Sequence, residues 1–293
     1  MHVFLTGATG WVGATVAAEL LAAGHQVSGL VRNADKAQAL LAAGGQVVHG
    51  TLDDHDVLFA AAAKADAVIH TAFNHDFSRF AQNCAQDQRA IEVLGEALLG
   101  SERPLLVTSG LARLAQGRPA TEADKPGEGP DYLRRSEQAA QALAEKGVRA
   151  ASIRLAPTVH GVGDHGFVPI LIALAKQTGV AAWPAGADNH WAAVHRIDAA
   201  KVYRLALESG VTQPVYHAVA EEAIAMRDIA ITIGKMLGLP AEPREAAHFG
   251  WFANFAAGEM SASSEQTRQV LGWQPTQRTL LDDLSDEAYY AHS

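Results

Sequence analysis

The stretch His2-Val-Phe-Leu-Thr-Gly-Ala-Thr-Gly-Trp-Val-Gly13 decides the fold, because a short apolar run breaks there into three glycines spaced three apart. Residues 2–5 have the pattern of a buried parallel strand, and from Trp11 onward apolar residues recur at helical spacing. The glycines therefore stand where a strand turns into a helix.

Each glycine has a physical role in such a turn. Gly7 can take the tight turn, Gly10 lets the backbone approach a diphosphate, and Gly13 lets the helix pack closely on the strand. The N-terminus of the helix adds unpaired N–H groups and a partial positive charge. An ordinary strand-to-helix turn is the plain alternative. Because strand, glycines and helix keep the required register, we predict dinucleotide binding.

Composition excludes several classes of protein. The 293 residues, 48% hydrophobic and 19% charged, fit one large soluble domain or two unequal ones. No apolar run reaches the roughly 18 residues of a membrane helix, and the first strand begins without a basic-then-apolar leader. We expect a cytoplasmic protein with no membrane partner.

Charge and cysteine content limit the kinds of ligand and partner that the protein can bind. A formal charge of −9 without a basic stripe argues against nucleic acid. Cys84 is the only cysteine, which excludes an internal disulfide and a cysteine-based metal cluster. His160, Asp164 and His165 have metal-ligand chemistry, but their spacing matches no standard zinc motif. We expect no metal and a small-molecule substrate.

The residues at the end of the second strand, residues 26–31, are expected to determine whether NAD(H) or NADP(H) binds. An acidic side chain about 20 residues past the glycines would bind a ribose 2′-hydroxyl and repel a 2′-phosphate. This chain has Arg32 there, with Lys36 one turn on. Arg32 can pair with a phosphate and stack on adenine, although a solvated arginine is the alternative. The sequence favours NADP(H) over NAD(H).

Strands and helices alternate through the first 155 residues. Further strands are predicted at 46–49, 67–70, 105–109 and 150–155, and helices at 37–44, 86–99 and 131–145. This alternation predicts an α/β fold, a parallel sheet covered on both faces. Ligands bind beyond the carboxyl ends of such strands. That rim would hold residues 7–13, Arg32, Ala72, Ser109 and the start of the 131–145 helix.

Four motifs resemble one family, the extended and atypical short-chain dehydrogenase/reductases, which include epimerases and dehydratases. They are Thr6-Gly-Ala-Thr-Gly-Trp-Val-Gly13, Ile153-Arg-Leu-Ala-Pro-Thr-Val-His-Gly161, Val194-His-Arg-Ile-Asp198 and Leu271-Gly-Trp-Gln-Pro275. The resemblance implies a Rossmann-type doubly wound sheet with a smaller C-terminal substrate-binding domain. Residues 1–157 would form the cofactor-binding core, to which 192–220 return as a helix from 192 to 208 and a last strand. Residues 158–293 would form mainly the substrate domain, with a helix at 226–237.

The resemblance also implies which residues contact the cofactor. They are Thr6, Gly7, Thr9, Gly10, Trp11, Val12, Gly13, Arg32, Lys36, Thr51, Leu52, Ala72, Phe73, Ser109 and Pro157. One departure concerns adenine recognition, because the family's usual Gly-Asp-Leu reads Gly50-Thr51-Leu52 here.

The catalytic set departs further. The family uses a serine after the fifth strand and a Tyr-x-x-x-Lys pair on the next helix. Counting back from the sixth strand places Tyr132 on the tyrosine position and Ser136 on the lysine position. The catalytic serine position is Gly110, with Ser109 beside it. We predict Tyr132, Ser109 and His165 as the catalytic residues.

Without the lysine, reduction is the favoured direction. A tyrosine of pKa near 10 is a usable acid but a poor base at neutral pH. Arg135 would lie about 60° around the helix from Tyr132 and supply part of the missing charge, with Arg134 further away. His165, in a glycine-rich loop, is a second proton donor. A packing tyrosine and an exposed histidine are the alternatives.

These residues predict an NADPH-dependent oxidoreductase that reduces a carbonyl of a small or medium, partly apolar substrate. Aromatic residues concentrated in the second half favour an apolar pocket. One alternative is a non-catalytic NADP(H)-sensing regulator, because Gly110 and Ser136 fill two of three catalytic positions. A weaker one is a sugar-nucleotide epimerase, which needs a tyrosine base and an acidic residue at Arg32. Helices 86–99 and 131–145 either form a homodimer interface or only cover the sheet.

Overall fold

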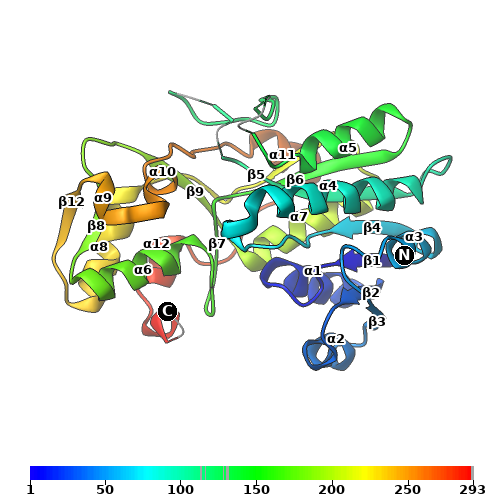
Figure 1. Ribbon diagram of the computed structural model, residues 1–293, viewed down its shortest axis with the longest axis horizontal. Coiled ribbons are helices and arrows are strands. Elements are labelled where there is room, and N and C mark those ends of the chain that lie inside the picture. The colour runs from blue at the N-terminus through cyan, green and yellow to red at the C-terminus, as the bar shows by residue number, and fades with distance from the viewer. Residues whose placement is uncertain (113, 116, 128, 130–131, 292–293) are drawn as a thin grey trace.

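A computed structural model describes residues 1–112, 114–115, 117–127, 129 and 132–291 of the chain (Figure 1). Its larger part is a seven-stranded sheet of order β10-β6-β5-β4-β1-β2-β3, in which every neighbouring pair is parallel. The strands are β1 (His2–Thr6), β2 (Gln26–Val31), β3 (Gln46–His49), β4 (Ala67–His70), β5 (Pro104–Gly110), β6 (Arg149–Leu155) and β10 (Val215–Ala218).

Helices cover both faces of this sheet. Those of the larger part are α1 (Trp11–Ala22), α2 (Gln38–Ala42) after the 3₁₀ turn η1 (Ala34–Ala37), α3 (His55–Lys64), α4 (Phe80–Glu96) after η2 (Phe77–Arg79), α5 (Ser136–Glu145), α7 (Arg196–Glu208) and α11 (Glu265–Leu271). Strand residues alternate between faces. Val3 and Leu5 pack toward α1 and α7, whereas Phe4 packs toward α3, α4 and α5. Figure 1 shows α4 and α5 side by side over one face. This arrangement confirms the doubly wound, Rossmann-type prediction.

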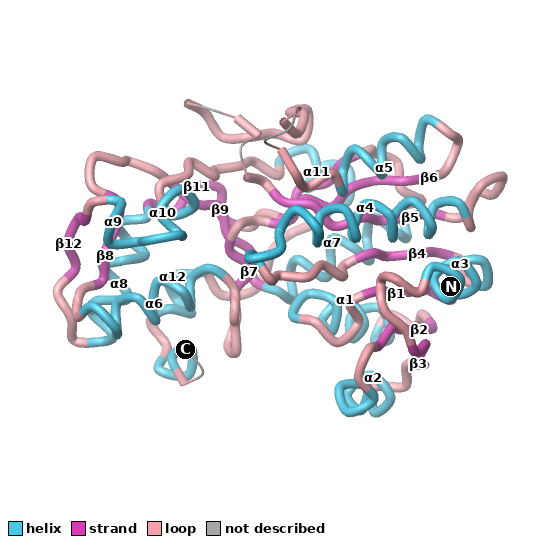
Figure 2. The backbone as a smooth tube through the Cα atoms, in the orientation of Figure 1, coloured by secondary structure: helices cyan, strands magenta, loops and turns pink. Residues whose placement is uncertain are grey.

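A smaller group of elements has its own apolar core. Two short sheets, of order β11-β9-β7 and β12-β8, combine with the remaining helices. These elements are β7 (Thr158–His160), α6 (Phe167–Thr178), β8 (Ala181–Pro184), β9 (His190–His195), β11 (Glu221–Ala225), α8 (Met226–Leu237), β12 (Ala241–Arg244), α9 (Ala246–Phe249), η3 (Gly250–Phe252), α10 (Ala253–Ala256), α12 (Leu280–Leu284) and η4 (Glu287–Tyr290). Figure 2 shows β7 and β9 on the side of this group that faces the large sheet.

Several predicted elements have the predicted bounds, namely the strands 26–31, 46–49 and 67–70 and the helix 226–237. Two predictions were wrong at positions that matter for the site. The helix predicted from 131 begins only at Ser136, so Tyr132 lies in the segment before it. The helix predicted from 192 begins at Arg196, because residues 190–195 pair as β9 with β7 and β11. The division into 1–157 and 158–293 stays a prediction.

Candidate cofactor and active site

The glycine turn after β1 is closely packed. Gly7 has φ +72°, and a Cβ there would lie 2.7 Å from the Thr71 hydroxyl oxygen. A Cβ on Gly13 would lie 2.0 Å from the carbonyl oxygen of Gly7. The Gly10 amide donates to that same carbonyl at 2.8 Å, and Gly10 precedes the first turn of α1. The turn thus brings the N-terminus of α1 against β1 and β4, where the strand order reverses and ligands of such sheets bind.

A buried chain of hydrogen bonds starts at Thr6, the last residue of β1. The Thr6 hydroxyl lies 2.8 Å from Nδ1 of His70, whose Nε2 lies 3.0 Å from Asp87. The Ser136 hydroxyl donates to the other oxygen of Asp87 at 2.5 Å. All four side chains are buried. They connect the end of β1 to the start of α5, although the sequence interpretation assigned Ser136 only to the empty lysine position.

Arg134 continues this chain toward the rim of the sheet. Its Nε donates to the Ser136 hydroxyl at 3.1 Å and its Nη2 to the carbonyl of Thr108 at 3.2 Å. The guanidinium carbon lies 4.3 Å from the centre of the Phe73 ring. The prediction that Arg134 faces away and Arg135 faces Tyr132 was wrong. Helical angles do not apply before Ser136, and Arg135 is exposed.

Tyr132 is half-buried in the segment before α5. Burial raises the pKa of Tyr132, the charge of Glu137 raises it further, and the charge of Arg134 partly offsets both. The phenol is therefore protonated at neutral pH, as predicted for a lone tyrosine. No hydrogen bond joins Tyr132 to Ser109 within the described residues. Its assignment as a proton donor remains a prediction.

The other two predicted catalytic residues lie in different surroundings. Ser109 is buried on β5 in register with Arg154 on β6, and its hydroxyl has no hydrogen-bond partner among the described residues. His165 is exposed, with its ring centre 5.5 Å from that of Trp11. The structure therefore brings His165 to the glycine turn, while Ser109 lies on the strand two positions from β1 in the sheet order.

Trp11 ties the glycine turn to the segment after β6. Its indole N–H donates to the carbonyl of Val159 at 2.7 Å, and the Arg196 guanidinium lies 4.3 Å over its ring. Pro157, in the same segment, is half-buried between β6 and β7. Thr9 and Val12 are also half-buried in and after the turn. The Trp11 hydrogen bond therefore links the glycine turn to the segment that contains Pro157.

The opposite, adenine end of the rim carries two exposed cations. The side chains of Arg32, after β2, and Lys36, in η1, make no hydrogen bond or ion pair with another described side chain. Thr51 is already engaged, because its amide and its hydroxyl both donate to Asp54, at 2.7 and 2.8 Å. Leu52 packs, half-buried, on the apolar core beneath β3 and α3. Arg32 and Lys36 are therefore open to a ligand at this end.

Aromatic rings line the segment after β4. The Phe77 and Trp251 ring centres are 5.8 Å apart, and the two side chains are 42% and 68% exposed. Phe77 also lies 6.3 Å from Phe167 of α6. Ala72 and Phe73 are half-buried at the start of this segment. We call Phe77, Phe167 and Trp251 the aromatic wall; it joins the large sheet's rim to the smaller group of elements.

Sequence reasoning missed His75, which lies on this segment between Phe73 and Phe77, at 5.3 and 6.3 Å between ring centres. Partial desolvation lowers the pKa of His75, and the charges of Arg134 and His165 lower it further. The signal was present, since Phe73-Asn-His-Asp-Phe77 directly follows a predicted strand on the ligand rim.

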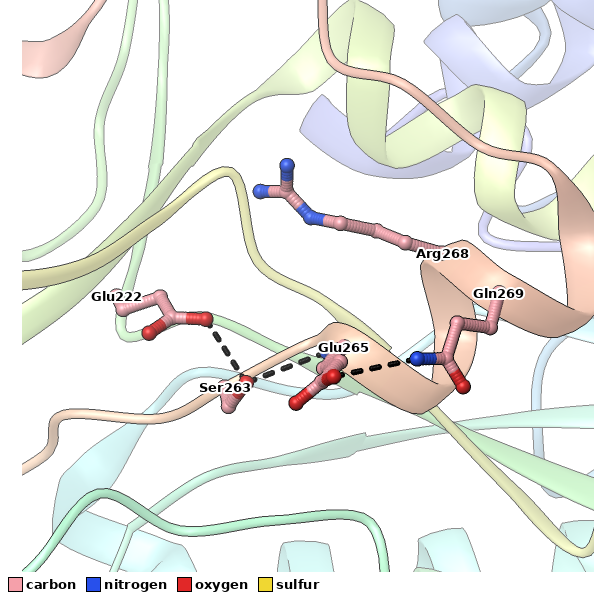
Figure 3. A pocket seen from close by; sticks show the side chains of 5 residues that line it. All are labelled: Glu222, Ser263, Glu265, Arg268 and Gln269. Carbon is pink, nitrogen blue, oxygen red and sulfur yellow. Dashed lines mark hydrogen bonds between the residues drawn. The ribbon is translucent and has the colours of Figure 1, made fainter.

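A surface hollow of about 460 Å³ lies elsewhere, lined by Glu222, Ser263, Glu265, Arg268 and Gln269 (Figure 3). Its polar groups are largely engaged with the protein, because Arg268 donates to the Ala220 carbonyl at 2.8 Å and Ser263 donates to Glu222 at 2.8 Å. None of its lining residues belongs to the predicted site.

The described residues contain neither a cluster of metal ligands nor a membrane-spanning helix. In that part of the chain, no group of three or more His, Cys, Asp or Glu side chains is arranged to hold a metal ion. Over the same residues, every helix is too short or too polar to cross a membrane.

Comparisons with known proteins agree with this geometry. Residues 7–161 match a family model described as NAD(P)H-binding. The chain is 46% identical over 295 residues to protein C2A9.02 of Schizosaccharomyces pombe, covering 99% of this chain and 100% of that one. It is 28% identical over 281 residues, 85% of this chain and 80% of the relative, to the 4-hydroxy-2-methyl-3-oxo-4-farnesyl-3,4-dihydroquinoline-1-oxide ketoreductase of Stigmatella aurantiaca.

A solved structure gives the fold independently. UDP-glucose 4-epimerase of Thermus thermophilus, in complex with NAD, superimposes with a TM-score of 0.75 at 18% identity, covering 100% of both chains. The match between residues 7–161 and the family model includes the glycine turn and strands β2 to β6. The chain therefore belongs to the NAD(P)H-binding family, with the fold of the epimerase- and dehydratase-type short-chain dehydrogenase/reductases, and its cofactor is a nicotinamide dinucleotide.

Proposed function

We propose that the protein is an NADPH-dependent reductase of a carbonyl group on a small or medium, partly apolar substrate. One observation carries the proposal. The tight glycine turn and a fixed guanidinium lie on the same rim of the sheet, and an exposed aromatic wall joins that rim to the smaller group of elements. A dinucleotide site next to an apolar surface with protonated groups suits the reduction of a ketone or an aldehyde.

The residues present fit the phosphorylated cofactor. The glycine turn and the N-terminus of α1 would hold the diphosphate. Arg32 and Lys36 are exposed beyond β2, and a 2′-phosphate would give both a partner. This supports NADP(H), while the family allows either nicotinamide cofactor.

The direction of the reaction follows from the proton donor. NADPH, when bound, supplies the hydride that the carbonyl carbon accepts. Tyr132 would donate its phenolic proton to the carbonyl oxygen, so that C=O becomes CH–OH, and would regain a proton from solvent. Its raised pKa keeps the phenol protonated at neutral pH, which is the form that can donate a proton and cannot accept one as a base. His165, beside Trp11, is the second donor that we propose.

The aromatic wall supports an apolar substrate. Exposed Phe77 and Trp251 offer ring faces next to the rim, and stacked or edge-on aromatic contacts add about 0.5–1.5 kcal/mol beyond burial. The Stigmatella relative is named for a ketone carried on a farnesylated dihydroquinoline. A flat, partly apolar ketone therefore fits this surface better than a sugar nucleotide does.

One alternative function is cofactor binding without catalysis. Ser136 is buried against Asp87 and Gly110 has no side chain, so two catalytic positions of the family contribute no group here. A non-catalytic NADP(H) sensor would need only the glycine turn. The epimerase alternative is weaker, because the raised pKa of Tyr132 and the presence of Arg32 both oppose it.

The experiment is NADPH oxidation over a panel of aromatic and aliphatic ketones and aldehydes. We expect turnover with aromatic members, slowed roughly 100-fold in Tyr132→Phe, the usual scale for a lost general acid. Tyr290→Phe is the matched control, because among the described residues the partner of that hydroxyl is the Leu284 carbonyl. Unchanged turnover in Tyr132→Phe would remove this residue from the mechanism. Tight NADP(H) binding without turnover on any carbonyl would favour the sensor.

A further inference from the structure

We propose that Arg134 binds an oxygen atom of the bound ligand, with its Nη1 group as the donor. The ligand atom is either a hydroxyl of the cofactor's nicotinamide ribose or the carbonyl oxygen of the substrate. The inference rests on the proposed function and names a residue that neither the glycine motif nor the sequence comparison assigns.

The guanidinium of Arg134 is already fixed by the protein. Phe73 supports its face at 4.3 Å, Thr108 accepts from Nη2, and Ser136 accepts from Nε. Nη1 has no acceptor among the described residues, and the side chain is only half-buried. A donor held in place loses little conformational freedom when a ligand arrives, which strengthens its hydrogen bond.

Its position is on the ligand rim. Phe73 follows the carboxyl end of β4 by three residues, and Thr108 lies near the carboxyl end of β5. β4 is the direct neighbour of β1, which carries the glycine turn. The cation therefore stands beside the crevice where the strand order reverses and where dinucleotides lie in this class of sheet.

Arg134 has no carboxylate bonded directly to it among the described residues. No salt bridge joins it to a carboxylate in the described parts of the chain, and Asp87 reaches it only through the Ser136 hydroxyl. A partly desolvated cation without a counter-charge costs free energy. Binding an electron-rich oxygen recovers part of that cost, which a purely structural arginine paired with a carboxylate would not need.

The small residue at position 136 is also consistent with this role of Arg134. Ser136 is fully buried, and its hydroxyl accepts from Arg134 while donating to Asp87. A long side chain at 136 would enter the space that Arg134 occupies. The hydrogen bonds from Ser136 through Asp87 and His70 to Thr6 then fix Ser136, and with it Arg134, relative to the end of β1. Arg134 thus supplies, from two residues earlier, a cation at the place where Ser136 has none.

The test compares wild type with Arg134→Met, Arg134→Lys and Arg134→Gln, using the exposed neighbour in Arg135→Met as the control. Calorimetric titration of NADP⁺ reports cofactor binding without turnover. Steady-state reduction of an aromatic ketone at saturating NADPH reports the substrate. Circular dichroism and thermal unfolding check the fold, and Arg134→Gln, which keeps polar donors without the charge, is used where Arg134→Met does not fold.

Loss of a charge-assisted hydrogen bond predicts a change of about 10- to 100-fold. A rise of that size in the Kd of NADP⁺ assigns the acceptor to the cofactor. An unchanged Kd with an equal fall in kcat/KM assigns it to the substrate. Arg134→Lys should recover part of either loss and Arg135→Met should show neither. Wild-type values of both quantities in a folded Arg134→Met or Arg134→Gln overturn the inference alone, whereas wild type without NADP(H) binding overturns the proposed function as well.

Discussion

Gly13→Ala tests whether close packing of the glycine turn holds the cofactor site together. The new Cβ would lie 2.0 Å from the Gly7 carbonyl oxygen and 2.6 Å from the Thr71 hydroxyl. Relaxed contacts between non-bonded heavy atoms are about 3.5–4.0 Å, so the backbone of Gly7 must move by more than ~1 Å. That movement breaks the bond from the Gly10 amide to the Gly7 carbonyl, now 2.8 Å long.

Two contributions to the stability of Gly13→Ala have opposite signs. Alanine in place of a helical glycine gains about 1 kcal/mol of stability. Overpacking costs typically 1–3 kcal/mol, and more where the clash is with backbone, as it is here. We expect a net loss of about 1–2 kcal/mol in the free energy of unfolding and a rise of at least ~10-fold in the Kd of NADP⁺, equivalent to about 1.4 kcal/mol.

Urea unfolding and calorimetric titration measure the two quantities. Ala18→Gly is the control, because Ala18 is exposed on the same helix. It should lose about 1 kcal/mol of stability through helix propensity and keep the wild-type Kd. A Gly13→Ala protein that is more stable than wild type and binds NADP⁺ equally well would refute the packing argument.

Three further predictions follow from other parts of the structure. Arg32→Glu should raise the ratio of the NADPH to the NADH dissociation constant by about 10- to 100-fold, measured by calorimetry, and an unchanged ratio would place the 2′-phosphate elsewhere. Trp251→Ala should raise KM for aromatic ketones about 3- to 10-fold, while an equal rise for small aliphatic ketones would contradict stacking. His217 donates to the Ser263 carbonyl and accepts from Arg154. Burial, with Arg154 opposing a second proton, lowers the pKa of His217 to about 4. The unfolded chain takes up that proton near pH 6.5, so stability is full above pH 6.5 and falls by about 3 kcal/mol toward pH 4. Urea unfolding across this range should show a shallower slope in His217→Gln, and equal slopes would exclude His217 as the cause.

The sequence was sufficient for the fold because local patterns specify its elements. Parallel strands buried on both faces read as apolar runs, and the predicted strands 26–31 and 67–70 have those bounds in the structure. The edge strand predicted at 46–49 also has its predicted bounds. Gly7 and Gly13 were assigned to the dinucleotide-binding turn from the strand-to-helix register alone. Their close approaches to Thr71 and to each other show why other residues do not fit there.

The catalytic side was less predictable because it depends on where one helix begins. Arg135, at the N-cap of α5, makes no capping hydrogen bond through its side chain, so the sequence carries no start signal there. Counting back from the sixth strand assigned Tyr132 to the family's tyrosine position by spacing alone, which carries no information on its conformation. Placing it on the helix led to the wrong choice between Arg134 and Arg135.

The buried chain could not be predicted for a different reason. Thr6, His70, Asp87 and Ser136 come from four separate elements, and their pairing appears only when the sheet and its helices are assembled. In the sequence, Asp87 stands between two glutamines on a helix and resembles a solvated residue. Buried polar networks of this kind are visible only in three dimensions.

The contact between Phe77 and Trp251 constrains how a substrate enters. Inserting a flat molecule between two rings needs roughly 7 Å, two stacking distances, between their planes. The ring centres are 5.8 Å apart and the planes are tilted by 32°. A planar guest must therefore push the indole aside or settle against the outer face of the pair. Association that waits for the pair to separate is slower than diffusion.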